Sequence, residues 1–211
     1  MESISEVRKA HGVVTIHLSD ETVFKLPSVV YYNFRVLPGD LFDREKYASL
    51  IENQCYTCAL ERAGKLLTNK DYTEREIERK LKSSCYPETV IARVLQALTE
   101  HHFVSDERYA TEFVRKKTAS VGRNRMKQDL RRKGVSDKII SAAVEQMDDE
   151  EELSGAVKLA EKLARRKDFT DRKQRAQAYA ALVRRGYPTD IVKKAMEQVS
   201  KEQDDDLFEY D

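Results

Sequence analysis

One short cassette occurs three times in this chain, and it constrains the fold more than any other feature. The copies occupy residues 81–95, 130–144 and 182–196, at intervals of 49 and 52 residues. Each copy opens on a leucine, has a glycine or cysteine four positions later, and continues into paired apolar residues. Repeats of about 50 residues bury little apolar surface alone and gain a core by stacking. The pattern therefore predicts a mainly α protein built of tandem three-helix repeats in an elongated, curved stack.

The ends of the predicted helices are marked by particular residues. Gly134 and Gly186 are expected to end the first helix of the cassette in a left-handed conformation, with the next apolar residue closing the corner. Thr73 and Glu76 have the spacing of a capping box at a helix start. Ser136 can cap the second helix of the middle copy. Each copy is thus predicted to be a helix, a tight corner and a second helix.

The first 45 residues have a different pattern of apolar and polar residues from the rest of the chain. His11–Leu18 and Thr22–Leu26 alternate apolar and polar residues, as the strands of a β-hairpin do, and Val29–Leu37 is predicted to add a third strand. The predicted organisation is a small β element at 1–45, a linking helix at 46–70, helical repeats at 71–120, 121–168 and 169–200, and an acidic tail at 201–211. The third helix of the first repeat is expected to run from Ser105 or Asp106 through Val114, and that of the second to run through Leu153 to Ala164.

Several functional classes are excluded by what the sequence lacks. It has no run of 18 apolar residues and no apolar signal-peptide core at its start, so neither membrane insertion nor export is expected. Its three cysteines cannot all pair within the chain, which fits a reducing, cytoplasmic compartment. Nucleotide-binding glycine loops, zinc-protease and serine-hydrolase motifs are absent. No enzyme activity, cofactor or small-molecule substrate is therefore predicted.

The cysteines and histidines also form no recognisable metal site. Cys55 and Cys58 are closely spaced, but structural zinc takes four ligands, and only Cys85, His101 and His102 could complete the set. A second closely spaced pair of cysteines is missing. We therefore interpret the thiols as helix residues and the histidines as loop residues, and predict no metal.

Positive charge is concentrated in two regions although the whole chain carries only +1. Residues 108–138 hold 11 Lys and Arg against three carboxylates, and residues 153–194 hold 12 against four, so each region has a net charge of +8. Acidic blocks at Asp148–Glu152 and Glu202–Asp211 balance them, and are expected to be solvated and disordered or to mask the basic surface. Basic surfaces of this density favour a polyanion or an acidic protein as partner over a merely solvated helix face.

The candidate partner and nucleic-acid contacts are the cations of these two regions. They are Arg115, Lys116, Lys117, Arg123, Arg125, Lys127, Arg131, Arg132, Lys133, Arg172, Lys173, Arg175, Arg184 and Arg185. A helix-turn-helix reader of DNA sequence is a weaker alternative, because the second helices open with Glu88, Asp137 and Asp190, which would meet a strongly negative groove. The middle region is predicted to contribute most.

An ordered series of short motifs resembles the RecX family, the bacterial regulators of the RecA recombinase. Residues Val104–Ala110 resemble the family's hydrophobic–acidic–Asp–Glu–Arg–aromatic–Ala segment, with Ser105 standing where an acidic residue is usual. Gly122, Arg125, Leu130, Lys133–Gly134 and Ile139–Ile140 follow at the family's spacing. The resemblance covers roughly residues 59–199.

The resemblance implies a non-enzymatic modulator that lies in the groove of the RecA filament on single-stranded DNA. Such a protein limits filament growth and the recombinase and coprotease activities of RecA, and so acts on recombination, DNA repair and the SOS response. The implied partners are the RecA filament and single-stranded DNA, contacted directly or through RecA. Two alternatives stay open: a general nucleic-acid-binding helical-repeat protein, and a helical adaptor that binds no DNA.

Overall fold

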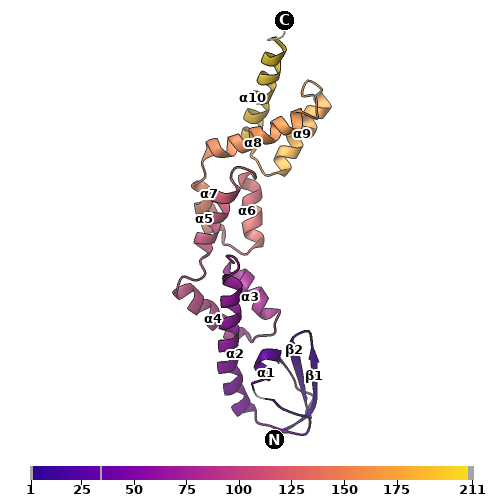
Figure 1. Cartoon of the computed structure of the whole chain (residues 1–211), viewed down its shortest axis with the longest axis vertical. Helices are drawn as coiled ribbons and strands as arrows, with labels where there is room; N and C mark the ends of the chain where they lie inside the picture. Colours follow the sequence, from indigo (N-terminus) through magenta and orange to yellow (C-terminus); the bar gives the residue numbers. More distant parts are fainter. Residues whose placement is uncertain (1, 34, 209–211) are drawn as a thin grey trace. The chain divides into compact units, whose positions relative to one another are not determined.

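The computed structural model describes residues 2–33 and 35–208, and the side chains within them except those of residues 46, 50, 51 and 201–208. The chain divides into two compact units, Met1–Ser105 and Asp106–Asp211, here called the N-terminal and C-terminal units. Figure 1 shows the strands confined to the N-terminal unit and helices making up most of the chain. The mainly α fold class is confirmed.

The N-terminal unit opens with an antiparallel sheet in the order β3-β2-β1-β4. Its strands are β1 (Glu2–Ala10), β2 (Val13–Leu18), β3 (Val23–Pro27) and β4 (Leu41–Phe42). The predicted hairpin is present as β2 and β3, with Ile16 paired to Phe24. Strand β1 was not predicted; it joins β2 through His11 and Gly12, both at positive φ, which is the conformation that a two-residue hairpin turn requires.

The strand predicted over Val29–Leu37 is wrong. Ser28–Tyr31 form the short helix α1, in which Val30 and Tyr31 are buried. The Tyr31 hydroxyl donates a hydrogen bond to the Val36 carbonyl at 2.7 Å, which folds the segment back on itself. A β-branched sequence favours a strand only where a sheet edge is available for it, and here burial against the sheet and α2 decides instead.

Three helices complete the N-terminal unit and form the first bundle: α2 (Arg44–Leu67), α3 (Glu74–Lys82) and α4 (Glu88–Glu100). Helix α2 corresponds to the linking helix predicted over 46–70, but it packs on both α3 and α4 and shares one hydrophobic core with the sheet. The predicted capping box is present, because the Thr73 hydroxyl accepts from the Glu76 amide and the Glu76 carboxylate accepts from the Thr73 amide. The helix is therefore a core element and not a linker.

The C-terminal unit contains two more bundles. The second consists of α5 (Asp106–Lys117), α6 (Arg123–Arg132) and α7 (Asp137–Glu145), and the third of α8 (Asp149–Ala164), α9 (Arg172–Arg184) and α10 (Thr189–Phe208). Helix α5 packs on α7, and α8 packs on α10. The predicted repeats join α5 and α8 to the hairpins before them, whereas in the structure each helix packs on the hairpin after it. The cassette marks only the hairpin, so it could not show to which side the third helix belongs.

All three corners of the cassette have the same backbone conformation. Gly134 and Gly186 have φ of 91° and 96°, as predicted, and Cys85 takes the equivalent position with φ of 61°. The next residue is buried in each copy, as Tyr86, Val135 or Tyr187. The left-handed corner is thus a property of the fold, kept in the first copy although cysteine bears a Cβ that glycine lacks.

The two acidic blocks were expected either to be solvated and disordered or to mask the basic surface, and both lie at least partly in helices. Asp148 caps α8, and its first turn holds Asp149–Glu152, where carboxylates face the positive end of the helix dipole. Helix α10 continues to Phe208 through most of the segment predicted as an acidic tail; residues 209–211 lie outside the described part. No helix among the described residues is long and apolar enough to span a bilayer.

Candidate nucleic-acid interface

Most of the predicted cations of the second bundle are already paired with carboxylates. Arg115 Nη2 lies 2.8 Å from Glu112 Oε2, and Lys116 Nζ lies 3.6 Å from the same oxygen. The Arg115 hydrogen bond lowers the pKa of Glu112, which therefore stays ionised. Because these pairs are exposed, each adds little stability, but each reduces the charge that a polyanion would meet.

The remaining cations of α6 follow the same pattern. Asp129 accepts from Arg132 and lies 3.2 Å from Arg125 Nε, so one carboxylate serves two guanidinium groups. Arg131 Nε lies 2.6 Å from Asp137 at the start of α7. Residues 108–138 still carry a net charge of +8, but most of the cations on α6 lie in ion pairs and do not form a row of free cations.

Arg123 is held inside the C-terminal unit. Its backbone amide and its Nε each donate to Glu152 of α8 at 2.7 Å, and its Nη2 also pairs with Asp149. The Glu152 side chain is completely buried, with 0% of its surface exposed. Burial opposes the charged form of Arg123, but the hydrogen bonds to Glu152 and Asp149 outweigh it and raise the pKa of Arg123. This geometry is that of a structural ion pair, which leaves little of Arg123 for a partner.

The ion pair lies beside a joint between the second and third bundles. The Gly122 amide donates to the Arg185 carbonyl at 3.3 Å, and the Asn124 amide donates to the Gly186 carbonyl at 3.0 Å. Free amides at the start of α6 thereby satisfy free carbonyls at the end of α9, and the opposite ends of two helix dipoles meet. Arg185 adds a bond from its Nε to the Ser120 carbonyl at 3.1 Å, so it too is part of the joint.

Two glycines make this close approach possible. A Cβ on Gly122 would lie 2.2 Å from the Gly186 carbonyl carbon, and a Cβ on Gly155 would lie 2.8 Å from the Ala119 carbonyl oxygen. Both distances are shorter than a Cβ atom can approach another heavy atom, so no residue with a side chain fits at either position without a shift of the backbone. Sequence reasoning missed Glu152, Gly122 and Gly155 as joint residues; nothing in the sequence brings residue 122 next to residues 152 and 186, since that contact is made only when the bundles stack.

The cations of α9 differ from those of α6. Arg172, Lys173, Arg175 and Arg184 are exposed, and no carboxylate among the described residues forms an ion pair with them. Helix α9 has no acidic residue in its first turn apart from its cap, Asp171, whose side chain accepts from the Gln174 amide. Of the predicted cations, those of the third bundle are therefore the least neutralised by neighbouring carboxylates.

Three more lysines of the predicted set, besides Lys116, lie on the second bundle. Lys117 is exposed at the end of α5, and Lys127 is half-buried on α6. Lys133 stands over the Tyr109 ring, with Nζ 5.2 Å from the ring centroid, in a cation–π contact. Most of the fourteen predicted residues thus fall into paired or packed cations on the second bundle, joint residues at Arg123 and Arg185, and free cations on α9, with the exposed Lys117 as a further free cation on α5 among the described residues.

Cys55 and Cys58 offer no reactive thiolate. Cys55 is fully buried on α2, and burial raises its pKa to about 12. Burial, with a smaller effect from Glu61, also raises the pKa of Cys58. Both thiols therefore stay protonated at neutral pH, whereas metal binding and nucleophilic attack need the thiolate. Within the described residues, no group of three or more His, Cys, Asp or Glu side chains could hold a metal ion.

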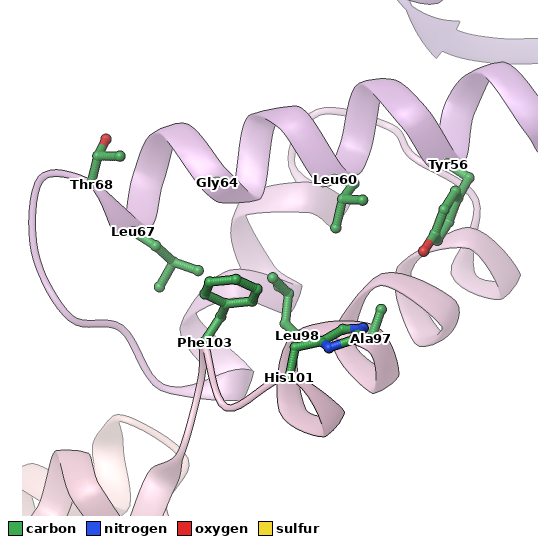
Figure 2. Close-up of a pocket in the computed structure, with 9 residues that line it drawn as sticks. All are labelled: Tyr56, Leu60, Gly64, Leu67, Thr68, Ala97, Leu98, His101 and Phe103. Atoms are coloured by element: carbon green, nitrogen blue, oxygen red, sulfur yellow. The ribbon is translucent and has the colours of Figure 1, made fainter.

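An apolar cleft of about 530 Å³ lies between α2 and α4 in the N-terminal unit. Figure 2 shows Leu67, Leu98 and Phe103 turned towards one another at one end of it, with His101 beside them. Phe103 is 63% exposed. The lining residues include one imidazole but no carboxylate or thiol, so the cleft lacks the paired groups that acid–base or nucleophilic catalysis requires.

Comparison with known protein families matches all three bundles. Residues 59–98, 105–144 and 149–196 match the models described as the first, second and third three-helix domains of RecX. Together these segments cover more than half of the chain. Their limits agree with the grouping of helices in the structure, in which α5 opens the second domain and α8 opens the third.

Similar proteins cover nearly the whole chain. A protein named regulatory protein RecX from Clostridioides difficile (strain 630) is 27% identical over 93% of this chain and 93% of its own. One from Limosilactobacillus reuteri (strain DSM 20016) is 28% identical over 96% of this chain and 80% of its own. Because so little of the chain is left uncovered, these matches include most of the N-terminal β element.

Two solved structures have the same fold. A crystal structure of regulatory protein RecX is 26% identical, covers 92% of this chain and 100% of its own, and superposes with a TM-score of 0.64. The crystal structure of RecX from Lactobacillus salivarius is 26% identical, with a TM-score of 0.65 over 70% of this chain and 98% of its own. The three domain matches, the relatives and the shared fold lead to one conclusion: the chain belongs to the RecX family of regulatory proteins.

Proposed function

We propose that this protein regulates the RecA recombinase in the cytoplasm by binding in the groove of the filament that RecA forms on single-stranded DNA. Bound there, it limits filament growth and the recombinase and coprotease activities of RecA, and thereby modulates DNA repair and the SOS response. Membership of the RecX family supports RecA as the protein partner. Three similar bundles in one chain support contact with a partner that itself repeats.

The observation that carries the polyanion part of the proposal is the set of free cations on α9. Arg172, Lys173, Arg175 and Arg184 are exposed without a carboxylate partner in the described part of the chain. Free cations release counterions from a phosphate backbone when they bind, whereas cations already paired must first give up a carboxylate. We therefore expect the third bundle to contribute more to this contact than the second, the reverse of the preference that charge density alone gave.

A charge-reversal experiment tests the proposal. The variant Arg172→Glu/Lys173→Glu/Arg175→Glu is expected to lose most of the inhibition of RecA ATP hydrolysis on single-stranded DNA, with its helical circular dichroism unchanged. Its matched control is Arg115→Glu/Lys116→Glu/Arg132→Glu, which changes the net charge equally but removes cations already paired with Glu112 or Asp129. Equal loss in both variants would mean that only the overall charge matters.

Arg123 is unsuitable for such a test. Reversal to glutamate would place a second carboxylate against the buried Glu152, and a loss of activity would then report unfolding instead of lost contact. Titration of inhibition adds a second measurement with the unmodified protein. Inhibition well below one molecule per RecA subunit indicates capping of filament growth, whereas a need for near-saturation indicates coating of the groove.

The two other functional classes predict different binding. A general nucleic-acid-binding protein would be retained by single-stranded DNA but not by RecA alone, and a helical adaptor would be retained by neither DNA nor the filament. Pull-down on RecA with and without single-stranded DNA distinguishes the three. Stoichiometric binding to the filament that leaves ATP hydrolysis unchanged would contradict the regulatory proposal.

A further inference from the structure

A shallow cleft of about 330 Å³ lies on the third bundle, between α9 and α10. Tyr179, Ala176 and Met196 form its apolar part. Met196 is nearly buried, and the half-buried Tyr179 packs against the same hydrophobic core, so the core fixes both side chains in place. A supported aromatic ring beside a thioether is a suitable surface for a flat, polarisable group.

The polar part of the cleft is strongly cationic. Arg172 and Arg175 line it from α9, and Lys193 lines it from α10. Glu197 is the one carboxylate among the lining residues, which leaves a local net charge of +2. The three cations are exposed, and no ion pair forms between them and a carboxylate in the described residues. They are therefore available to an anion that enters the cleft.

This combination matches the chemistry of one nucleotide in a single strand. A nucleobase presents a flat π face to an aromatic ring, and the phosphates on either side of that base need cations around the ring. The base must be unpaired to leave its own stack and reach a side chain on a protein surface, so a duplex does not fit. A volume of about 330 Å³ is at the small end of ligand sites and is suited to a nucleotide rather than to a bulkier group.

We propose that the cleft formed by Arg172, Arg175, Tyr179 and Lys193 binds one nucleotide of a single-stranded nucleic acid, with the base on Tyr179 and the flanking phosphates at the three cations. The proposal deepens the proposed function, because it names a site for the strand on this chain itself. Its biological role rests on that function, but the binding can be measured without RecA. It also assigns the contact to a feature that no sequence motif marks, since the cleft combines residues from two helices.

Fluorescence anisotropy of a labelled oligo(dT) strand with the whole chain tests the site. We expect Tyr179→Leu to weaken binding about tenfold, as loss of one stacked base does, and Tyr179→Phe to bind as the unmodified protein does. Lys193→Ala should weaken binding and lower the slope of log affinity against log salt by about 0.7, the value for one phosphate of a single strand. Lys194→Ala is the matched control, because Lys194 is the exposed neighbour of Lys193 but does not line the cleft.

A second measurement does not depend on affinity. The chain has no tryptophan, so Tyr179→Trp introduces a single tryptophan at the cleft, and excitation at the long-wavelength edge of its absorption avoids the tyrosines. Its fluorescence should be quenched by oligo(dT) and not by an abasic strand with the same phosphates. Circular dichroism and thermal unfolding of each variant show whether the third bundle is intact.

The possible results separate this site from the wider function. Weakened oligo(dT) binding in Tyr179→Leu and Lys193→Ala but not in Lys194→Ala supports the site, even if RecA activity is unaffected and the regulatory proposal fails. Equal binding by all variants, or equal quenching by the abasic strand, overturns the nucleotide site. A loss of RecA binding with oligo(dT) binding unchanged also overturns it and indicates an acidic protein segment as the occupant.

Discussion

Replacement of Arg123 with alanine is expected to destabilise the C-terminal unit by about 3 kcal/mol, because it leaves the buried Glu152 carboxylate without its cation. Loss of one partner of a buried pair costs about 3–5 kcal/mol in general. The lower end applies here for two reasons. The Arg123 backbone amide still donates to Glu152 at 2.7 Å in the variant, and the Arg123 side chain is 28% exposed, so water can partly replace it.

Urea unfolding followed by circular dichroism measures this loss of stability directly, and for a unit of this size the loss corresponds to a fall in melting temperature of roughly 13 °C. The control is Arg115→Ala, which breaks the exposed pair with Glu112 and should cost less than about 0.5 kcal/mol. The double variant Arg123→Met/Glu152→Met removes both charges and should be more stable than Arg123→Ala. A loss below about 1 kcal/mol in Arg123→Ala, or a double variant as unstable as the single one, would refute the assignment of this pair as a buried joint.

Three further predictions concern glycine, the left-handed corner and a thiol. Gly122→Ala should destabilise the C-terminal unit by at least about 2 kcal/mol, because the added Cβ would overlap the Gly186 backbone. Its control, Gly64→Ala, places a Cβ in open space on α2 and should stabilise the N-terminal unit by about 0.5–1 kcal/mol. Chemical denaturation measures both changes. Cys85→Gly should stabilise the first bundle by up to about 1 kcal/mol, because it removes the backbone strain of a residue with a Cβ at φ of 61°. The gain is limited because glycine also raises the conformational entropy of the unfolded chain. A melting temperature below that of the unmodified protein would contradict this prediction. Burial raises the pKa of the Cys55 thiol to about 12, so the folded chain keeps a proton that the unfolded chain releases from about pH 9. The contribution of this thiol to the free energy of unfolding should therefore be complete below pH 9. It should fall by about 1 kcal/mol by pH 10, because the unfolded state alone is then deprotonated. The decline should be smaller in Cys55→Ala when unfolding is measured at pH 8 and pH 10.

The helical hairpins of the cassette and several of their ends could be predicted from sequence because they depend on local chemistry. The capping box at Thr73, the cap at Ser136 and the left-handed glycines at 134 and 186 each act within one turn of the chain. The β2–β3 hairpin was predictable for the same reason, since alternation and a short turn define it. The segment after β3 was not, because burial against α2 overrides the strand preference of its residues.

The candidate interface was predicted in composition but not in arrangement. Sequence identifies where Lys and Arg are dense, and that remains true of α6 and α9 alike. It does not show that Asp129, Asp137 and Glu152 fold onto the cations of α6, while those of α9 stay free. Ion pairing is decided by distances of a few ångströms between side chains, some of them 29 residues apart in the chain.

The threefold cassette by itself determined that this protein is a helical repeat and where its hairpins lie, because each copy carries the same periodic pattern of apolar residues and an equivalent corner residue. The ordered motifs from Val104 to Ile140 determined which family it resembles. Only the tertiary structure decided which helix completes each bundle, that the glycines at 122 and 155 allow two bundles to dock, and that Tyr179 and Lys193 share one cleft. Those features depend on the packing of segments far apart in sequence, and packing is fixed by shape and distance in the folded chain.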